Sequence, residues 1–468
     1  MWSGWSCGGI CLCSGRKGRS IAPGKNATGA AGRGVLETVF DFPPWLGFSG
    51  LVPNAPESPV LFFTAFEPSG DDHASAVIRE LRTRHPDLAI HAWGGPKMAA
   101  AGAEIIRDTG DDAVMGLPGP GKINRHLSYN RKIGRWLDAN KVTVHIPVDS
   151  PAANFPICKL TRKHGIKIVH LVAPQIWAWA GWRIRKLRRL TDHVLCLLPF
   201  EEKWFESRGV KATFIGHPVF DEPLQLDDAA GQKDSLPEGE PRVALMPGSR
   251  PSEVKRNFPL LLEAFRQLKL RSPGLAGVVA ATNDHVADNL QAIANRQGGW
   301  PADLGMIVGG VDIATRWCDV ALAVSGTVTL HITKQHRPMV VVYRLNPFTY
   351  NLVARWVINT EHFALPNLIA NRRIVPEFVP YFGGPDRLVR EAARLIESPE
   401  ARRGQEMSLR EVARCFEGKT AAIAAADAIE KEAGLTSDTG GAAPSLASPG
   451  ASVEIRSRPM NSGASLKH

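Results

Sequence analysis

The chain has 468 residues, of which 44% are hydrophobic and 22% charged, as in a soluble globular protein of two or three domains. A mean hydropathy of −0.12 excludes a polytopic membrane protein, and no apolar run is long enough to form a spanning helix. The net charge of +10 predicts an anionic partner, either nucleic acid, a membrane face or a phosphorylated substrate.

The two ends of the chain have the composition of disordered segments. Residues 1–57 and 434–468 are rich in small residues and proline and show no periodicity. The first segment lacks the order of a secretory signal, because its basic residues follow its weak apolar part. Three of the seven cysteines lie in the first 13 residues, and the others are scattered without a CxxC pair. This usage predicts a reducing compartment and no zinc site or disulfide framework.

Between these ends, short apolar runs alternate with helical patterns. The runs are rich in β-branched residues and show little alternation, which is typical of strands buried on both faces of a parallel sheet. The expected strands are 60–66, 88–93, 142–148, 168–173, 193–198, 243–246, 277–281, 306–308, 320–324 and 339–343. The clearest helix is expected over 69–84, with Ser69 as its N-cap.

This alternation predicts an α/β protein made of two Rossmann-like, doubly wound parallel-sheet domains that face a cleft. Each domain is expected to hold roughly five strands, and the cleft between them is the default ligand site. The polar, Pro- and Gly-rich stretch 221–241 is the expected connection. We therefore expect an N-terminal extension at 1–57, a first domain at 58–222, a linker at 223–241, a second domain at 242–433 and a C-terminal tail at 434–468.

Two strand ends in the second half carry the strongest local signal. Each brings small residues to a helix N-terminus, where backbone N–H groups can approach a phosphate, and one ends in an arginine suited to a diphosphate. Ordinary βα turns also need small residues, but the two loops together favour a nucleotide diphosphate. No dinucleotide or P-loop fingerprint occurs. The residues concerned are Gly248, Ser249, Arg250, Ser325, Gly326 and Thr327.

In the first half, Asp149 comes directly after the third expected strand. Functional groups collect at that end of an open α/β sheet, and an aspartate there is a candidate general base towards a sugar hydroxyl. The residues alone explain Asp149 somewhat better as a helix N-cap, because Pro151 follows two residues later. The residues alone leave both interpretations open.

A second unusual stretch runs from Ser150 to Thr191, with no acidic residue and with Trp177, Trp179 and Trp182 among the basic ones. Such a stretch can bind single-stranded nucleic acid, can seat a protein on an anionic membrane, or is simply a solvated basic helix with tryptophans in the core. No nucleic-acid motif is present, so the membrane ranks above nucleic acid. The nine basic residues are Lys159, Arg162, Lys163, Lys167, Arg183, Arg185, Lys186, Arg188 and Arg189.

Metal chemistry finds no support in the sequence. There is no HExxH, no paired His/Cys spacing and no DxD. We therefore expect no metal and no other cofactor, and a leaving diphosphate would be stabilised by Arg250 and helix N-termini.

Taken together, the motifs resemble the lipid-A-disaccharide synthase family, glycosyltransferases of family 19 with the GT-B fold. The resemblance covers about residues 58–400 and leaves both ends outside. The matching segments are EPSGD (67–71), GGPKM (94–98), AVMG (113–116), VDSPAAN (148–154), APQIWAW (173–179), LPFE (198–201), FIGHPV (214–219), PGSR with Glu253-Val254 (247–254), SGTVTL (325–330), NPFTYNLVARW (346–356), LPNLIA (365–370) and VPEF (375–378).

The resemblance implies an inverting, metal-independent transferase. It would condense UDP-2,3-diacylglucosamine with 2,3-diacylglucosamine 1-phosphate, releasing UDP and giving the β(1→6) disaccharide precursor of lipid A. It also implies an enzyme of a Gram-negative bacterium that lies in the cytoplasm and binds peripherally to the anionic inner membrane. It implies no nucleic-acid partner, and a homodimer is possible. The first domain would serve the acceptor and the membrane, and the second, with its closing helices, the UDP-sugar.

The resemblance also assigns site residues. Asp149 would be the base or acceptor-positioning group, and Arg250 would hold the diphosphate. The other residues it places at the substrates are Ser69, Asp71, Gly248, Ser249, Ser325, Gly326, Thr327, His331 and Asn367.

Several positions depart from the family pattern. Phe66 replaces a glycine, Ala153 an aromatic residue, and His331 the glutamate expected at the ribose hydroxyls. Residues 117–127 (LPGPGKINRHL) replace an apolar helix that the family uses at the membrane, and their prolines and glycines predict no helix. These departures keep two alternatives open: a divergent paralogue acting on another UDP-sugar or acceptor, and a non-catalytic basic protein that binds membranes or nucleic acid through 159–189.

Overall fold

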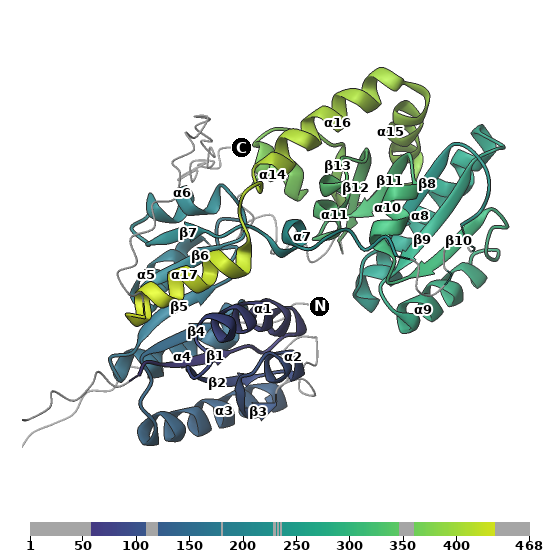
Figure 1. Cartoon of the computed structure of the whole chain (residues 1–468). Coiled ribbons are helices and arrows are strands. Elements are labelled where there is room, and N and C mark those ends of the chain that lie inside the picture. The colour runs from purple at the N-terminus through teal and green to yellow at the C-terminus, as the bar shows by residue number, and fades with distance from the viewer. Residues whose placement is uncertain are drawn as a thin grey trace, which may run out of the picture. The chain divides into compact units, whose positions relative to one another are not determined.

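The computed structural model describes residues 58–108, 120–178, 181–227, 231, 234, 236–345 and 360–435, with side chains in the first helix after 120 described from 128 onwards (Figure 1). The expected disordered ends, the AVMG and NPFTYNLVARW segments and Trp179 lie outside these residues. Among the described residues, no helix is long and apolar enough to cross a membrane.

The first sheet has seven parallel strands in the order β3-β2-β1-β4-β5-β6-β7. They are β1 (Val60–Thr64), β2 (Ala89–Gly94), β3 (Glu104–Asp108), β4 (Val144–Pro147), β5 (Lys167–Leu171), β6 (His193–Cys196) and β7 (Ala212–Phe214). The helices that connect them are α1 (Pro68–Arg84), α2 (Pro96–Ala100), α3 (Pro120–Ala139), α4 (Pro151–Lys163), α5 (Ile184–Leu190) and α6 (Glu201–Glu206).

The second sheet has six parallel strands in the order β10-β9-β8-β11-β12-β13. They are β8 (Arg242–Met246), β9 (Ala276–Ala281), β10 (Leu304–Val308), β11 (Val320–Val324), β12 (Met339–Arg344) and β13 (Glu377–Tyr381). The described helices from the connection onwards are α7 (Pro218–Asp221), α8 (Pro251–Arg271), α9 (Asp284–Asn295), α10 (Val311–Trp317), α11 (Val328–Lys334), α14 (Leu365–Ala370), α15 (Asp386–Glu397), α16 (Pro399–Arg414) and α17 (Ala421–Ala433).

The two parallel sheets confirm the predicted fold class, and all ten expected strands are present. The estimate of about five strands a domain is too low, since the sheets hold seven and six. The apolar runs are buried on both faces of each sheet. In β1, for example, Leu61 and Phe63 belong to one core cluster and Phe62 to another, on the opposite face.

Two local expectations about helices are wrong. The helix expected over 69–84 begins at Pro68, so Glu67 rather than Ser69 is its N-cap, because proline at the first helical position pre-sets the backbone there. Residues 120–127, for which no helix was predicted, form the start of α3. Pro120 again stands at the first position, where proline costs nothing because its missing N–H would have no partner.

The last described helix packs against the first sheet, although we grouped its residues with the second domain. Ala425 and Ile429 of α17 are buried in the same cluster as Leu61 of β1, and Figure 1 shows α17 beside β5. Glu430 accepts hydrogen bonds from Arg84 (3.0 Å) and bonds to His85 (3.0 Å), at the end of α1. The chain therefore returns to the first domain after building the second.

Candidate active site

The predicted motifs lie at the points where each sheet changes its strand order. In the first sheet, β1 and β4 are neighbours although they are not consecutive, and the same is true of β8 and β11 in the second. At such switch points the connections leave in opposite directions and open a crevice at the carboxyl ends of the strands. EPSGD follows β1, VDSPAAN begins at the end of β4, PGSR follows β8, and SGTVTL follows β11.

Asp149 lies on a strained turn. Its φ is 48° and that of Ser150 is 27°, while Val172, at the end of the neighbouring strand β5, has a φ of 64°. Left-handed backbone is costly for residues other than glycine, about 1–3 kcal/mol each, and it concentrates at functional sites. Asn154 holds the turn in place, donating to the carbonyls of Val148 (2.8 Å) and Asp149 (3.1 Å).

The cap interpretation of Asp149 is wrong, because Ser150 occupies the N-cap position of α4. The Ser150 hydroxyl donates to Glu67 at 2.6 Å, which joins the turn after β4 to the loop after β1. Burial raises the pKa of the Asp149 carboxyl; the Ser150 N–H lowers it, nearby Glu67 raises it, and Arg250 lowers it. That Asp149 and Arg250 act in one site stays a prediction, and the Ser150–Glu67 bond adds Glu67 to the groups beside Asp149.

Arg250 is positioned by a tight turn and an acidic neighbour. Gly248 has a φ of 102°, and a Cβ on it would lie 3.0 Å from Glu253 Oε2, so only glycine fits. Glu253, in the first turn of α8, accepts hydrogen bonds from Arg250 (3.0 Å) and Tyr343 (3.2 Å). Sequence reasoning did not assign a role to Glu253 or Tyr343, although Glu253 lies within the quoted motif.

The loop after β11, which holds Ser325, Gly326 and Thr327, is fixed by a hydrogen bond at Ser325 and exposed at Thr327. The Ser325 hydroxyl donates to the carbonyl of Phe363 at 2.8 Å. A Cβ on Gly326 would meet no atom within 4 Å, and Thr327 is exposed. The helix that follows, α11, has seven residues and ends at Lys334. The backbone of this loop is therefore accessible to a ligand.

Asp71 is tied to the backbone of a neighbouring helix. Its buried carboxylate accepts from the N–H groups of Gly95 (3.2 Å), Lys97 (3.0 Å) and Met98 (3.0 Å) at the start of α2. A Cβ on Gly95 would lie 2.5 Å from this carboxylate, which explains the GGPKM motif. Ser69 is exposed on the first turn of α1.

Asn367 is likewise engaged within the protein. It is fully buried, its side-chain oxygen accepts from the N–H groups of Ile374 (2.8 Å) and Val375 (2.9 Å), and its amide donates to Val375 O (3.0 Å). These bonds fold the LPNLIA segment back onto the chain that enters β13. Whether its remaining N–H reaches a nucleotide stays a prediction.

His331, which replaces the family's glutamate, has an acidic partner that sequence reasoning missed. Its Nδ1 lies 3.3 Å from Oδ1 of Asp312 in α10, and Asp312 also accepts from the N–H of Gln225 (3.0 Å). Burial disfavours the charged carboxylate, but the bonds from His331 and Gln225 together hold the pKa of Asp312 below its usual value.

His217, from the FIGHPV motif, lies near this pair. Burial, together with the neighbouring His73 and His331, lowers its pKa to about 3. Its Nδ1 accepts from the N–H of Val219 at 3.2 Å, so the neutral ring carries its proton on Nε2. No group of three or more His, Cys, Asp or Glu side chains among the described residues is arranged to hold a metal ion.

The comparisons with known proteins identify the family. The family model for lipid-A-disaccharide synthetase matches residues 61–426. The lipid-A-disaccharide synthase of Anaeromyxobacter dehalogenans (strain 2CP-C) is 36% identical over 356 residues, which cover 75% of this chain and 92% of that protein. This chain belongs to the lipid-A-disaccharide synthetase family. The synthase of Aeromonas hydrophila is also 36% identical, over 71% of this chain and 88% of that protein.

Solved structures support the fold of this synthetase family member. UDP-GlcNAc 2-epimerase from Neisseria meningitidis, bound to UDP-GlcNAc, matches with a TM-score of 0.55 at 13% identity, covering 80% of this chain and 99% of that one. The glycotransferase of kitacinnamycin gives 0.54 at 17% identity, with the same coverage. At these identities the likeness concerns the two-domain fold alone.

Proposed function

We propose that the chain is an inverting glycosyltransferase that joins UDP-2,3-diacylglucosamine to 2,3-diacylglucosamine 1-phosphate through a β(1→6) bond. Membership of the synthetase family carries this proposal. It is supported by a strained, half-buried aspartate after β4 whose titration Arg250 influences. These are the two groups that such a transfer needs, one for the attacking hydroxyl and one for the leaving diphosphate.

Each residue then has a defined task. Asp149 takes the proton from the 6-hydroxyl of the acceptor as that oxygen forms its bond to the anomeric carbon of the donor. Burial raises the pKa of Asp149, which makes the carboxylate a stronger base. The bond from the anomeric carbon to the diphosphate breaks, and UDP leaves with both electrons. Arg250, held by Glu253, stabilises the charge that develops on the diphosphate.

The test is to incubate the purified protein with both substrates and to measure disaccharide and UDP. Asp149→Asn should lower kcat by about 10²–10⁴-fold, and Arg250→Ala by about 10²–10³-fold. Asp87→Asn, an exposed change after α1, is the control and should keep full activity. Absence of product from the wild-type protein would overturn the proposal, and unchanged rates in either variant would remove that residue's role.

A second candidate function is transfer from another UDP-sugar or to another acceptor. The observation that favours it is the His331–Asp312 pair, which replaces a lone glutamate where the ribose is expected, together with Phe66 in the first loop. Competition among several UDP-sugars for turnover separates the two functions. A preference for a non-acylated sugar would favour the divergent paralogue.

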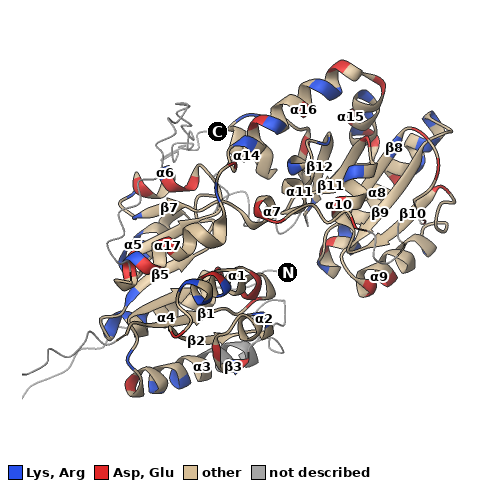
Figure 2. Cartoon of the chain, viewed as in Figure 1, with Lys and Arg blue, Asp and Glu red and all other residues tan. Residues whose placement is uncertain are grey.

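We further propose that the enzyme works on the cytoplasmic side of the inner membrane and docks there through α5 and the turn before it. Trp182 is 66% exposed. Figure 2 marks the Lys and Arg positions of the ribbon at α5 in blue. Burial lowers the pKa of Lys186, and the neighbouring basic residues Lys159 and Arg183 also lower it, as expected for charges crowded together without acids. An anionic surface would relieve that repulsion while Trp182 enters the headgroup region.

Vesicle sedimentation tests this docking. The wild-type protein should bind vesicles that contain phosphatidylglycerol and leave vesicles of phosphatidylcholine alone. Replacing Trp182 by Ala together with Arg185 and Arg189 by Gln should lower binding by about tenfold or more, at roughly 1 kcal/mol per lost charge. Unchanged sedimentation would contradict the docking without affecting the transferase proposal, since turnover of detergent-dispersed substrates needs no vesicle.

A further inference from the structure

A cavity outside the candidate active site gathers four arginines. It has a volume of about 470 Å³ and lies between α15 and the chain that enters and begins β13. Its lining includes Arg373, Arg387, Arg390 and Arg394, a single acidic residue, Glu391, and an apolar wall to which Phe378 belongs. Figure 2 marks the basic positions of α15 in blue.

The packing of α15 explains why the arginines face this space. The helix buries Leu388, Val389, Ala392, Ala393 and Leu395 against the second sheet. Arg387, Arg390 and Arg394 stand three and four residues apart, so they share one side of the helix. Like charges at that spacing repel one another by a few tenths of a kcal/mol a pair, and an anion bound between them would relieve this repulsion.

Few protein groups neutralise this charge. Arg394 pairs with Glu391 at 3.0 Å, and Arg373 donates to the carbonyl of Glu377 at 3.1 Å. Within the described part of the chain, Arg387 and Arg390 form no ion pair. The cavity thus holds four cations against one carboxylate.

The cavity is distinct from the crevice at Arg250. In the second sheet β13 is an edge strand, three positions away from β8, which corresponds to about 14 Å at the usual strand spacing. Residues 373–376 lead into the amino end of β13, whereas Arg250 follows the carboxyl end of β8. All pairings in this sheet are parallel, so the two positions lie towards opposite ends of the strands.

We propose that this cavity binds a small phosphate-bearing anion as a second ligand site of the enzyme. Guanidinium groups bind phosphate oxygens in pairs, and several of them favour a dianion or a diphosphate over a single carboxylate. The volume falls in the range of small-molecule sites, and the wall formed with Phe378 accommodates the apolar part of such a ligand. The phosphate belongs either to a soluble metabolite or to a lipid headgroup, which share this chemistry.

Isothermal titration with inorganic diphosphate tests the site. Because Arg250 also attracts a diphosphate, the titration is made in the Arg250→Ala background, which removes the arginine of the candidate active site. Adding Arg390→Ala and Arg394→Ala should weaken binding by at least about tenfold, the effect of losing roughly 1.4 kcal/mol. Arg403→Ala, an exposed arginine on α16, is the matched control and should change nothing.

Three results would overturn the proposal: no diphosphate binding in the Arg250→Ala protein, equal binding after the cavity arginines are removed, or an equal loss with Arg403→Ala. Circular dichroism and the melting temperature show that each variant is folded. A short-chain phosphatidic acid that binds more tightly than diphosphate would assign the site to a headgroup, and equal affinity would assign it to a soluble phosphate. Loss of transferase activity in all variants would concern the proposed function alone, since binding is measured directly.

Discussion

At the scale of single residues, Asp149 combines strained backbone with a half-buried carboxyl group whose pKa is raised by desolvation. Because its pKa is raised in the folded state, the protein binds this proton more tightly when folded. Its contribution to stability is therefore full below the unfolded pKa of the group and is lost as the pH rises through the folded one. At neutral pH Asp149 is ionised, as the proposed reaction requires, and this ionisation should lower the free energy of unfolding.

Asp149→Asn should consequently be more stable than the wild type at pH 7, by about 2 °C in melting temperature, while losing activity. The gain should shrink as the pH falls towards 4, where the wild-type carboxyl takes up its proton. The acid limb of kcat/KM in the wild type should lie above the ordinary range of an aspartate. Calorimetry at both pH values checks the first part, and an Asn variant less stable than wild type at pH 7 would contradict it.

The His331–Asp312 pair gives a second prediction at this scale. The carboxylate favours the tautomer in which Nδ1–H donates to Asp312, leaving Nε2 free to accept from a sugar hydroxyl. His331→Glu would place a second carboxylate beside Asp312, so its KM for the UDP-sugar should rise by about tenfold, or 1.4 kcal/mol. Adding Asp312→Asn should restore most of that loss. Strictly additive losses in this double-mutant cycle would show that the pair is not coupled.

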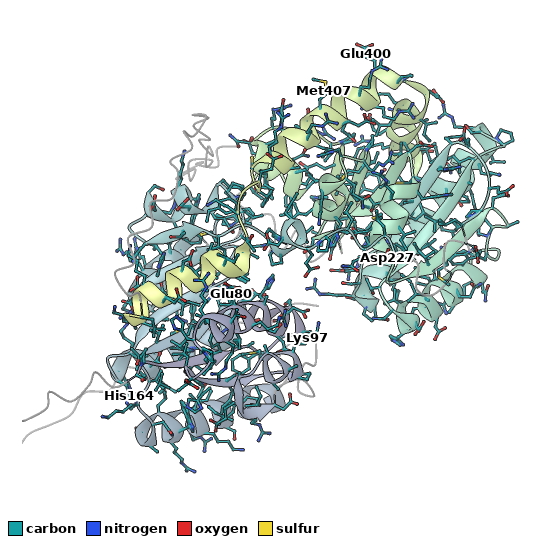
Figure 3. The ribbon with its side chains drawn as sticks, viewed as in Figure 1. Glu80, Lys97, His164, Asp227, Glu400 and Met407 are labelled. Carbon is teal, nitrogen blue, oxygen red and sulfur yellow. The ribbon has the colours of Figure 1, made fainter. Side chains whose placement is uncertain are left out.

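At the scale of elements, Asp71 acts as the N-terminal cap of α2 from another helix. Asp71→Ala would leave three backbone N–H groups without their acceptor, so the free energy of unfolding should fall by about 1–3 kcal/mol. Asp72→Ala is the matched control. It removes only the exposed pair with Lys97, labelled in Figure 3, and should cost at most about 1 kcal/mol. Denaturant unfolding measures both, and equal losses would contradict the capping role.

The three strands that sequence reasoning missed, β3, β7 and β13, are all edge strands. An edge strand has a neighbour on one side only, so it need not be uniformly apolar. EIIRD begins and ends in charged residues, ATF has only three residues, and EFVPY contains a proline that only an edge tolerates. The ten predicted strands are the nine central ones and the edge strand β10, and each carries an apolar run that the sequence shows.

The site follows the same division. Asp149 and Arg250 could be assigned as candidates because each lies in the loop after a strand, where the chain order alone places functional groups. Glu67 and Asp312 were not assigned because their partners, Ser150 and His331, are 83 and 19 residues away and meet them only in the folded chain. Asp71 and Asn367 were assigned to the ligand, and nothing local in the sequence shows that backbone N–H groups engage their side-chain oxygens.

At the scale of the whole molecule, α17 ties the end of the chain to its beginning. The helix packs its apolar face on the first sheet and also forms ion pairs with that domain. Glu432 pairs with Lys167 of β5 (3.5 Å) and with Lys211, and Glu430 pairs with Arg84. A chain that ends at 420 should therefore lose the first domain's cooperative unfolding, since the cluster around Leu61 and Ile78 would be uncovered. A chain that ends at 435 is the control and should melt as the full chain does. Equal melting of both truncations would contradict the tie.

The position of α17 also bears on how the protein is made. Domains fold as units, and usually the N-terminal one folds first during synthesis. Here the first domain lacks one of its covering helices until residue 433 has left the ribosome, whereas the sheet of the second domain is complete once β13 ends at Tyr381. In the nascent chain the second domain should therefore complete its fold before the first domain does. Until α17 has been synthesised, the first domain exposes apolar surface that chaperones can bind.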